Sequence, residues 1–284
     1  MKTKKHIFYI LQWSTILVFL GRAYQHWFWD APFRVLLWDE SWMKSIVETI
    51  TGSSWESFVT SETGDIFISS LIQTNGIFYF LFAVFTLFII KFAGNWSHFL
   101  LVGSGMLIFL AFLYMKEHFF NVGQFFEYSL QFGSPIFLWL YLRHWDRNKL
   151  LLWMKIAIAL TFTCHGLYAL GYYPVPGSFV EMTINIFHIE SQSAFQFLKL
   201  AGTLDFLVAI LIFVPKVSRF ALIYAFFWGF ITSFARIWAH FYIEMPWESL
   251  HQWIPEFLYR VPHFLIPLGG YFISLKQQNY ETSD

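Results

Sequence analysis

Long apolar runs separated by short polar segments dominate this chain of 284 residues. A transmembrane helix needs about 20 mostly apolar residues. Eight runs meet or approach that length, at residues 7–25, 74–92, 97–116, 129–143, 150–171, 195–214, 219–241 and 257–275. The pattern therefore predicts an all-α integral membrane protein with eight transmembrane helices.

The charges between these runs are unevenly distributed. Eight spans place both ends of the chain on one side, and the segments on that side hold most of the Lys and Arg residues, whereas nearly all acids lie on the other side. Because cytoplasmic loops carry an excess of Lys and Arg, we expect both termini in the cytoplasm. No small-residue cleavage site follows the first apolar run, so we expect it to be retained as a span.

The composition narrows the function classes. Hydrophobic residues make up 57% of the chain and charged residues 13%, against about 25% charged in an ordinary soluble domain. A net charge of zero argues against a nucleic-acid partner, which needs a basic surface. A single cysteine, Cys164, excludes an intramolecular disulfide and a thiolate zinc site, and we expect no metal site. The chain holds no HExxH, GxSxG or P-loop motif, so no catalytic residue can be assigned.

The two halves of the chain resemble each other. GRAYQHWFWDAPFR from Gly21 and GLYALGYYPVPGS from Gly166 each follow the first span of a half, and SHFLL and SRFAL open the third spans. Internal repeats are common in membrane proteins. We therefore predict two parallel four-helix repeats, at residues 1–147 and 148–284, with a chance similarity as the alternative.

The segment 27–73 is predicted to lie on the outer side. Pro32 is placed to start a helix, and Trp38, Trp42 and Ile46 recur at helical spacing. These features predict an amphipathic helix at the outer membrane interface. The alternative is a structural lid without chemistry.

Ionisable residues inside the apolar runs are the candidates for a functional site. A charged side chain at the centre of a bilayer costs about 2.5–3.5 kcal/mol on insertion scales and marks a functional site by default. Asp205 is predicted to lie near the midplane of its span, and the other candidates lie toward the outer ends of theirs: Arg22, His118, His165, Arg236, His240, Glu256, Arg260 and His263.

Helical spacing predicts that several of these side chains share one interior. Residues three, four or seven apart lie on one helix face. We therefore expect Asp205 to face a polar pocket that opens toward the outside, with Arg236 or His165 as its partner. For Arg22 and His118 the alternative is a side chain that snorkels to the interface.

Two cofactors are compatible with such a pocket. Histidines on facing spans are the usual axial ligands of a b-type haem, and the candidates are His165, His240 and His263, although their spacing is not specific to haem. A quinone or another lipid-soluble molecule needs aromatic walls and a His or Asp that exchanges protons. The 23% aromatic content suits the quinone better, and both cofactors remain open.

The second half also resembles a known family. TFTCHGLYALGYYPVPG, followed by FLKLAGTLDFLVAILIFVP, resembles the DoxX-like family of four-helix bacterial membrane proteins. That family carries a His-Gly pair near the outer end of its first span, matched at His165, and a Gly followed three residues later by an acid, matched by Gly202 and Asp205. Asp stands here where Glu is usual. The resemblance covers residues 150–275 and, more faintly, the first half, where Tyr79 takes the place of the acid.

The resemblance implies a bacterial inner-membrane protein. Some members of the family accompany redox systems, as the small subunit of a thiosulfate:quinone oxidoreductase or as a factor that matures a periplasmic dehydrogenase. We therefore expect a redox-associated or maturation subunit that contacts membrane lipid and a periplasmic or membrane oxidoreductase subunit, and that binds a quinone-like or amphipathic molecule. The alternatives are a transporter or channel with a proton or anion relay, and a scaffold whose acidic segment 30–66 holds a periplasmic partner.

Overall fold

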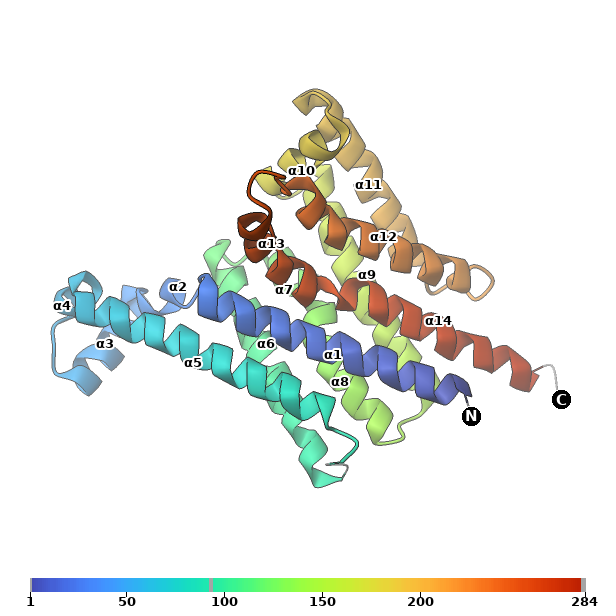
Figure 1. Ribbon diagram of the computed structural model, residues 1–284, viewed down its shortest axis with the longest axis horizontal. Helices are drawn as coiled ribbons and strands as arrows, with labels where there is room; N and C mark the ends of the chain where they lie inside the picture. The colour runs from blue at the N-terminus through green and yellow to red at the C-terminus, as the bar shows by residue number, and fades with distance from the viewer. Residues whose placement is uncertain (1, 92–93, 282–284) are drawn as a thin grey trace.

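The protein is helical throughout the part that the computed structural model describes, residues 2–91 and 94–281, which contains no strand (Figure 1). Six helical segments are long and apolar enough to cross a membrane: Lys5–Phe28, Glu62–Leu87, Trp96–Glu117, Arg147–Leu170, Ser191–Leu211 and Ser218–Ala239. They correspond to six of the eight predicted spans. The prediction of an all-α protein is thereby confirmed for the described residues, and the six apolar helices indicate a multi-pass membrane protein.

The first half of the chain contains eight α-helices and one 3-10 helix among its described residues: α1 (Lys2–Phe28), α2 (Arg34–Leu37), α3 (Glu40–Thr51), α4 (Trp55–Thr60), α5 (Glu62–Leu87), η1 (Asn95–His98), α6 (Phe99–Glu117), α7 (Val122–Glu127) and α8 (Ser129–Leu142). The second half contains α9 (Arg147–Leu170), α10 (Gly177–Phe187), α11 (Ser191–Leu211), α12 (Ser218–Ala239), α13 (Pro246–Arg260) and α14 (Pro262–Glu281).

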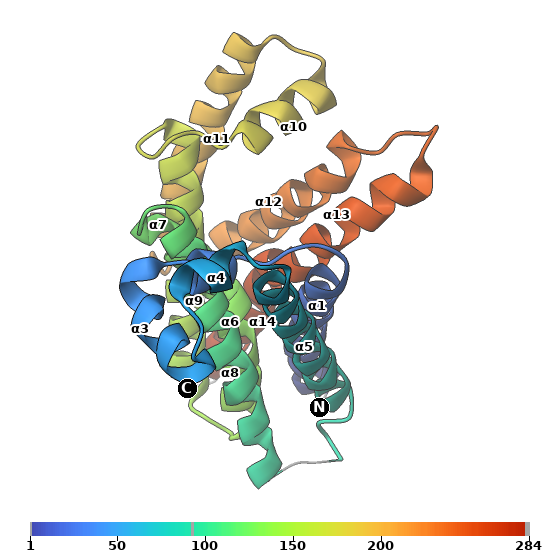
Figure 2. The ribbon, with the colours of Figure 1, turned by 90° about the vertical axis from the view of Figure 1, so that its left-hand side faces the viewer.

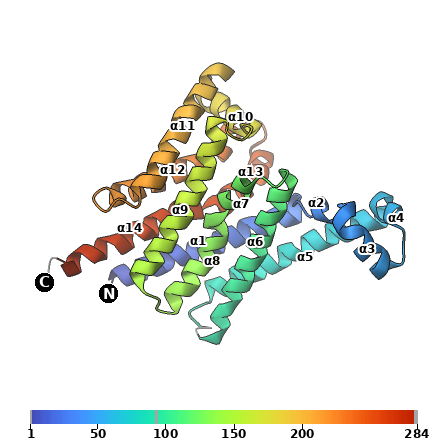
Figure 3. The same cartoon turned by 180° about the vertical axis from the view of Figure 1, so that it is seen from behind.

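The long helices run between two ends of the molecule. The start of α1 and the end of α14 lie at one end, whereas α2–α4, α7 and α10 lie toward the other (Figures 1 and 3). The core forms where α1, α8, α9 and α14 meet, and its fully buried residues include Leu11, Leu138, Met154, Ile158 and Ile266. The start of α1 and the end of α14 thus lie on one side of this core.

The two halves are interlocked. Within the halves, α1 packs along α5 and α9 packs along α11. Between the halves, α13 packs against α1, and α7 packs against α9. Viewed from the side, α9, α10 and α11 form one arm of the molecule and α12 and α13 form another (Figure 2). A short helix of each half thus supports the first helix of the other half.

Two predicted spans differ from the other six. The run 129–143 forms α8, whose 14 residues make a helix about 21 Å long at 1.5 Å per residue, shorter than a hydrocarbon core of about 30 Å. The run 257–275 is divided between two helices, because α13 ends at Arg260 and α14 begins at Pro262. Proline lacks an N–H group and cannot continue a helix without losing a hydrogen bond.

The outer segment is shorter than predicted. Residues 62–73 belong to α5, because the Ser61 hydroxyl accepts a hydrogen bond from the Gly64 N–H at 3.0 Å and caps the helix there. Glu62 and Asp65 lie in the first turn, where the helix dipole favours acids. The predicted boundary at residue 73 is therefore wrong by about three turns of helix.

The predicted amphipathic helix is present as α3, but it starts at Glu40 and not near Pro32. Asp39 caps it by accepting a hydrogen bond from the Trp42 N–H at 3.2 Å. Trp42 and Ile46 are half exposed, as the spacing predicted, and the preceding turn is a separate short helix, α2.

A lysine on α6 holds α3 in place. The Lys116 ammonium donates to the Asp39 carboxylate and lies 4.9 Å from the centre of the Trp42 ring. The hydrogen bond from Lys116 lowers the pKa of Asp39 to about 2. An ion pair and a cation–π contact thus tie α3 to α6.

Candidate functional site

A cavity of about 180 Å³ lies among α9, α10, α11, α12 and the junction of α13 with α14. Its polar wall includes His165, Asp205, Ser233, Arg236, Arg260 and His263. Its apolar wall includes Phe179, Met182, Phe197, Ala201, Trp228 and Ile231. The structure therefore brings five of the nine candidate residues from the sequence to one cavity, namely Asp205, His165, Arg236, Arg260 and His263.

The cavity depends on a close crossing of α9 and α11. A Cβ atom added to Gly166 would lie 2.9 Å from the carbonyl oxygen of Gly202, and one added to Gly202 would lie 3.0 Å from the carbonyl oxygen of Gly166. Small residues let two membrane helices approach this closely. His165 precedes one glycine and Asp205 follows the other by three residues, so the crossing places both side chains at the cavity.

Asp205 lines the cavity without a charged partner. Its side chain is 5% exposed, and within the described part of the chain its Oδ1 atom accepts no hydrogen bond. The Trp228 side chain lines the same cavity. The predicted partners were Arg236 or His165, and that prediction is wrong because both side chains pair with glutamates instead.

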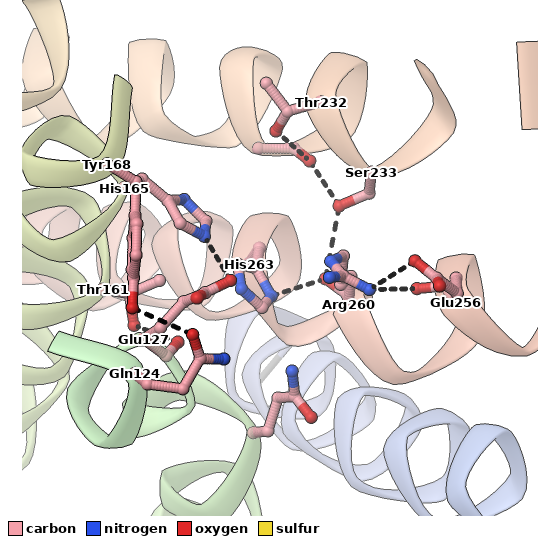
Figure 4. Close-up of polar contacts among 12 residues, drawn as sticks. Gln124, Glu127, Thr161, His165, Tyr168, Thr232, Ser233, Glu256, Arg260 and His263 are labelled. Atoms are coloured by element: carbon pink, nitrogen blue, oxygen red, sulfur yellow. Dashed lines mark hydrogen bonds and ion pairs between the residues drawn. The ribbon is translucent and has the colours of Figure 1, made fainter. Parts of the chain in front are cut away.

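His165 pairs with a residue from the first half of the chain. Its Nε2 atom lies 3.1 Å from Oε1 of Glu127 on α7. The Thr161 hydroxyl donates to the Glu127 carbonyl at 3.3 Å, and the Tyr168 hydroxyl donates to Oε1 of Gln124 at 2.9 Å (Figure 4). Thr161, His165 and Tyr168 lie on one face of α9, and this face contacts α7.

Sequence reasoning missed Glu127 because it was assigned to the outer acids. The available signal was its position, two residues before the apolar run 129–143 and directly after Phe125 and Phe126. An acid among apolar residues at the edge of a span is more often paired than solvated.

The ring of His263 lies against the ring of His165. Their centroids are 5.6 Å apart, and the planes differ by 11°. The Nδ1 atom of His263 donates to the Arg260 carbonyl at 3.0 Å, visible in Figure 4. The two stacked imidazoles form one side of the polar wall.

Two arginines share one carboxylate at the cavity. The Nη1 atoms of Arg236 and Arg260 lie 3.0 Å and 3.1 Å from Oε2 of Glu256. Both guanidinium groups are largely buried. The Ser233 hydroxyl donates to the Gly229 carbonyl at 2.6 Å and lies 3.5 Å from the Arg260 carbonyl (Figure 4). Glu256 does not line the cavity, but it fixes the two cations that do.

The histidines do not have the geometry of a haem site. His165 and His263 are stacked face to face, whereas axial ligands point a nitrogen at one iron. His240 lies outside the cavity wall, where its ring stacks on Trp253 at 3.8 Å and its Nδ1 atom donates to the Arg236 carbonyl at 2.9 Å. The cavity volume of about 180 Å³ is also below the roughly 300 Å³ at which pockets for drug-sized ligands begin. No set of three or more His, Cys, Asp or Glu side chains in the described residues could hold a metal ion.

Arg22 and His118 lie away from the cavity. Arg22 is only 1% exposed, so it does not snorkel. Its guanidinium lies 3.8 Å from the centre of the Tyr259 ring and donates to Oε1 of Gln131 at 2.6 Å. We call these residues, together with Gln25, Tyr114 and Tyr128, the Arg22 cluster. His118 is half exposed, and its Nδ1 atom donates to the Tyr114 carbonyl at 2.9 Å.

Comparison with known proteins gave no match to a family model, a curated protein or a solved structure. The function is therefore argued from the geometry of the cavity.

Proposed function

We propose that this protein is a membrane subunit that binds a quinone-like or other amphipathic small molecule in the cavity. The observation that carries the proposal is the contrast between the two walls. Asp205, His165 and Arg236 form a polar inner side, whereas the wall residues Phe187 and Ile231 are 51% and 54% exposed on the apolar surface. A molecule with a polar head and an apolar body matches both.

The volume of the cavity supports a ligand whose polar head is a single ring. An engineered apolar cavity of about 150 Å³ binds benzene, so a cavity of about 180 Å³ has room for one substituted ring. An apolar tail would then leave beside Ile231 on α12 and lie in the lipid. Burial of the ring contributes about 25 cal/mol per Å² of apolar surface.

The same proposal includes the arrangement in the membrane. We place α8 as the fourth span and the α13–α14 pair as the eighth, with both termini in the cytoplasm and the cavity toward the outer side. The common end of α1 and α14 and the distribution of Lys and Arg support this topology. The reciprocal packing of α7 on α9 and of α13 on α1 supports two four-helix repeats, 1–147 and 148–284.

The resemblance of residues 150–275 to the DoxX-like family supports a location in a bacterial inner membrane and an association with redox enzymes. Under this proposal the outer segment α2–α4 faces the periplasm, where an oxidoreductase subunit could contact it. Exposed acids on that segment, such as Glu48 and Glu56, would be available to such a partner.

A transporter is the second candidate, because ionisable pairs adjoin the cavity. The His165–Glu127 pair and the Arg236–Glu256–Arg260 group lie beside Asp205, and linked groups of this kind form proton relays in transporters. Loss of proton or anion flux in Asp205→Asn proteoliposomes, without loss of a bound lipid, would favour this function.

The test of the first candidate is to fill the cavity and to measure the bound ligand. Ala201 lines the cavity on α11, and the adjacent Leu200 is 61% exposed on the lipid side. Ala201→Phe should lower the amount of ring-bearing lipid that mass spectrometry detects in the purified protein by at least about tenfold. This decrease corresponds to a loss of about 1.4 kcal/mol of binding free energy. Leu200→Phe, which adds a ring on the same helix, should retain it. Wild-type protein without any ring-bearing lipid, or equal amounts in both variants, would contradict the proposal.

A further inference from the structure

The polar atoms of the cavity wall differ in whether the protein itself satisfies them. Arg236 and Arg260 each have a carboxylate partner in Glu256. His165 gives its Nε2 atom to Glu127, and His263 gives its Nδ1 atom to a backbone carbonyl. The atoms that remain define what a ligand must supply.

The tautomer of His263 follows from its partner. A carbonyl oxygen only accepts hydrogen bonds, so the Nδ1 atom of His263 carries the proton in its bond to Arg260. The ring is 3% exposed and adjoins a guanidinium group, which disfavours a second positive charge. The neutral ring therefore has its lone pair on Nε2, and this nitrogen is a hydrogen-bond acceptor.

Asp205 adds a second acceptor. Its Oδ1 atom has no hydrogen-bond partner in the described residues. A buried acceptor without a donor is unfavourable, because it has lost its hydrogen bonds to water. Arg236 adds one unmatched donor, since its buried Nε atom donates to no side chain or carbonyl within residues 2–91 and 94–281.

The unmatched groups of three cavity residues are thus two acceptors and one donor. A quinone has only carbonyl oxygens, so it could accept from Arg236 but could satisfy neither Asp205 nor His263. A hydroquinone has two hydroxyl groups, each of which donates one hydrogen bond and also accepts. It could donate to Asp205 and His263 and accept from Arg236.

We propose that the head group bound in the cavity is a hydroxylated aromatic ring, a hydroquinone in preference to the oxidised quinone. This inference rests on the proposed function and specifies its ligand. It concerns binding alone. A site that hydrogen-bonds a hydroxyl group rejects an analogue without it, because its own polar groups are then left unpaired.

The test compares three ligands on the full-length protein in lipid nanodiscs without oxygen. The probes are tritiated 2-decyl-1,4-hydroquinone, the corresponding 2-decyl-1,4-benzoquinone and the dimethyl ether of the hydroquinone, measured by equilibrium binding. We expect the hydroquinone to bind at least about tenfold more tightly than either other probe, since it alone can donate hydrogen bonds to both Asp205 and His263. The ether controls for ring and tail, which it shares with the hydroquinone.

Two substitutions at one position locate the effect. Asp205→Leu removes the acceptor and should reduce hydroquinone affinity to that of the quinone while it leaves quinone affinity unchanged. Asp205→Asn keeps a carbonyl oxygen as acceptor and should restore most of the preference. Circular dichroism and size-exclusion profiles check that both variants fold.

The outcomes separate the inference from the proposed function. Quinone binding that equals or exceeds hydroquinone binding, with both lost in Ala201→Phe, would overturn the preference and leave the ligand site intact. An equal loss of all three ligands in Asp205→Leu would also overturn it. Failure of all three probes to bind the wild-type protein would overturn the site itself.

Discussion

Two helix crossings in this protein carry buried polar residues, but the space beside these residues is filled at one crossing and hollow at the other. Where α1 packs along α5, Tyr79 is fully buried against Phe19 and His26, and Arg22 of α1 is fully buried as well. Where α9 packs along α11, His165 and Asp205 border a cavity. Large side chains fill the first crossing, whereas the second, where glycines let the two helices approach closely, borders a cavity.

The neighbours of the two positions correspond as well. Arg22 contacts Gln131 on α8 and Tyr259 on α13, a helix of the other half. His165 contacts His263 on α14 and Glu127 on α7, again a helix of the other half. The comparison teaches that two helix crossings in one bundle can hold a self-filled polar cluster in one case and a cavity in the other, according to the side chains at a few positions.

The largest expected effect is a loss of stability when the buried arginines beside the cavity lose their carboxylate partner. Glu256→Gln removes the carboxylate that pairs with the two buried guanidinium groups of Arg236 and Arg260. Removal of one partner from a buried ion pair costs about 3–5 kcal/mol, so we expect the free energy of unfolding to fall by that amount in denaturant titrations. Glu248→Gln, at an exposed position of the same helix, is the control. Equal stability of the two variants would show that Glu256 is not needed for neutralisation.

A smaller loss of stability is expected from a change in the Arg22 cluster. Among the described residues, no carboxylate lies within hydrogen-bonding distance of the Arg22 guanidinium. Gln131→Leu removes the acceptor that lies 2.6 Å from the Arg22 guanidinium. Hydrogen bonds to charged groups contribute about 1.5–3 kcal/mol, and the unfolding free energy should fall by this amount. Ser129→Ala is the matched control on α8. The Ser129 hydroxyl is buried and has no hydrogen-bond partner in the described part of the chain, so its removal should not destabilise the protein.

Asp205 should contribute less to stability than either of these residues. Asp205→Asn keeps the size of the side chain and removes a buried acid that has no charged partner among the described residues. We expect the unfolding free energy to change by less than about 1 kcal/mol. Glu127→Gln, which disrupts the pair with His165, should cost more. A strongly destabilised Asp205→Asn variant would mean that the aspartate is structural and that the contrast between the two crossings is not functional.

The smallest effect should come from the outer segment, and it depends on pH. The pKa of Asp39 is lowered to about 2 by its hydrogen bond from Lys116, so the folded state binds this proton less tightly than the unfolded chain. The pair therefore stabilises the fold above the usual pKa of about 3.9 and loses its contribution as the pH falls through about 2. Asp39→Asn keeps the helix cap but loses the charge pair. Thermal unfolding should show a lower midpoint for the variant at pH 7 and the same midpoint as wild type below pH 2; a constant difference would contradict this account.

Local features of the sequence were enough to predict most helices. Apolar runs specify membrane helices almost by themselves, because every backbone polar group in lipid must be satisfied within the segment. The cost of an ionisable side chain in lipid predicted the meeting of Asp205, His165 and Arg236 at one cavity. The α5 boundary was missed because the Ser61 cap lies far upstream of the apolar residues that defined the run.

The partners of the charged residues could not be predicted. His165 and Glu127 are 38 positions apart and meet only because α7 packs on α9, a contact between halves of the chain. Arg236 had several acids within reach of its helix end, and the choice of Glu256 depends on how α13 stops before Pro262. Depth in the membrane follows from local sequence, whereas pairing follows from tertiary packing.

A short helix of each half packs against the other half, and this packing has a consequence for biogenesis. The α7 contact with α9 and the α13 contact with α1 mean that neither half can reach its final packing while the other is absent. Helix α1 must wait for residues near 260, which follow it by more than 200 positions, although proteins usually fold from the N-terminus as they emerge from the ribosome. A chain truncated between the halves would therefore leave two surfaces uncovered, one on each fragment, that quality-control proteases could recognise.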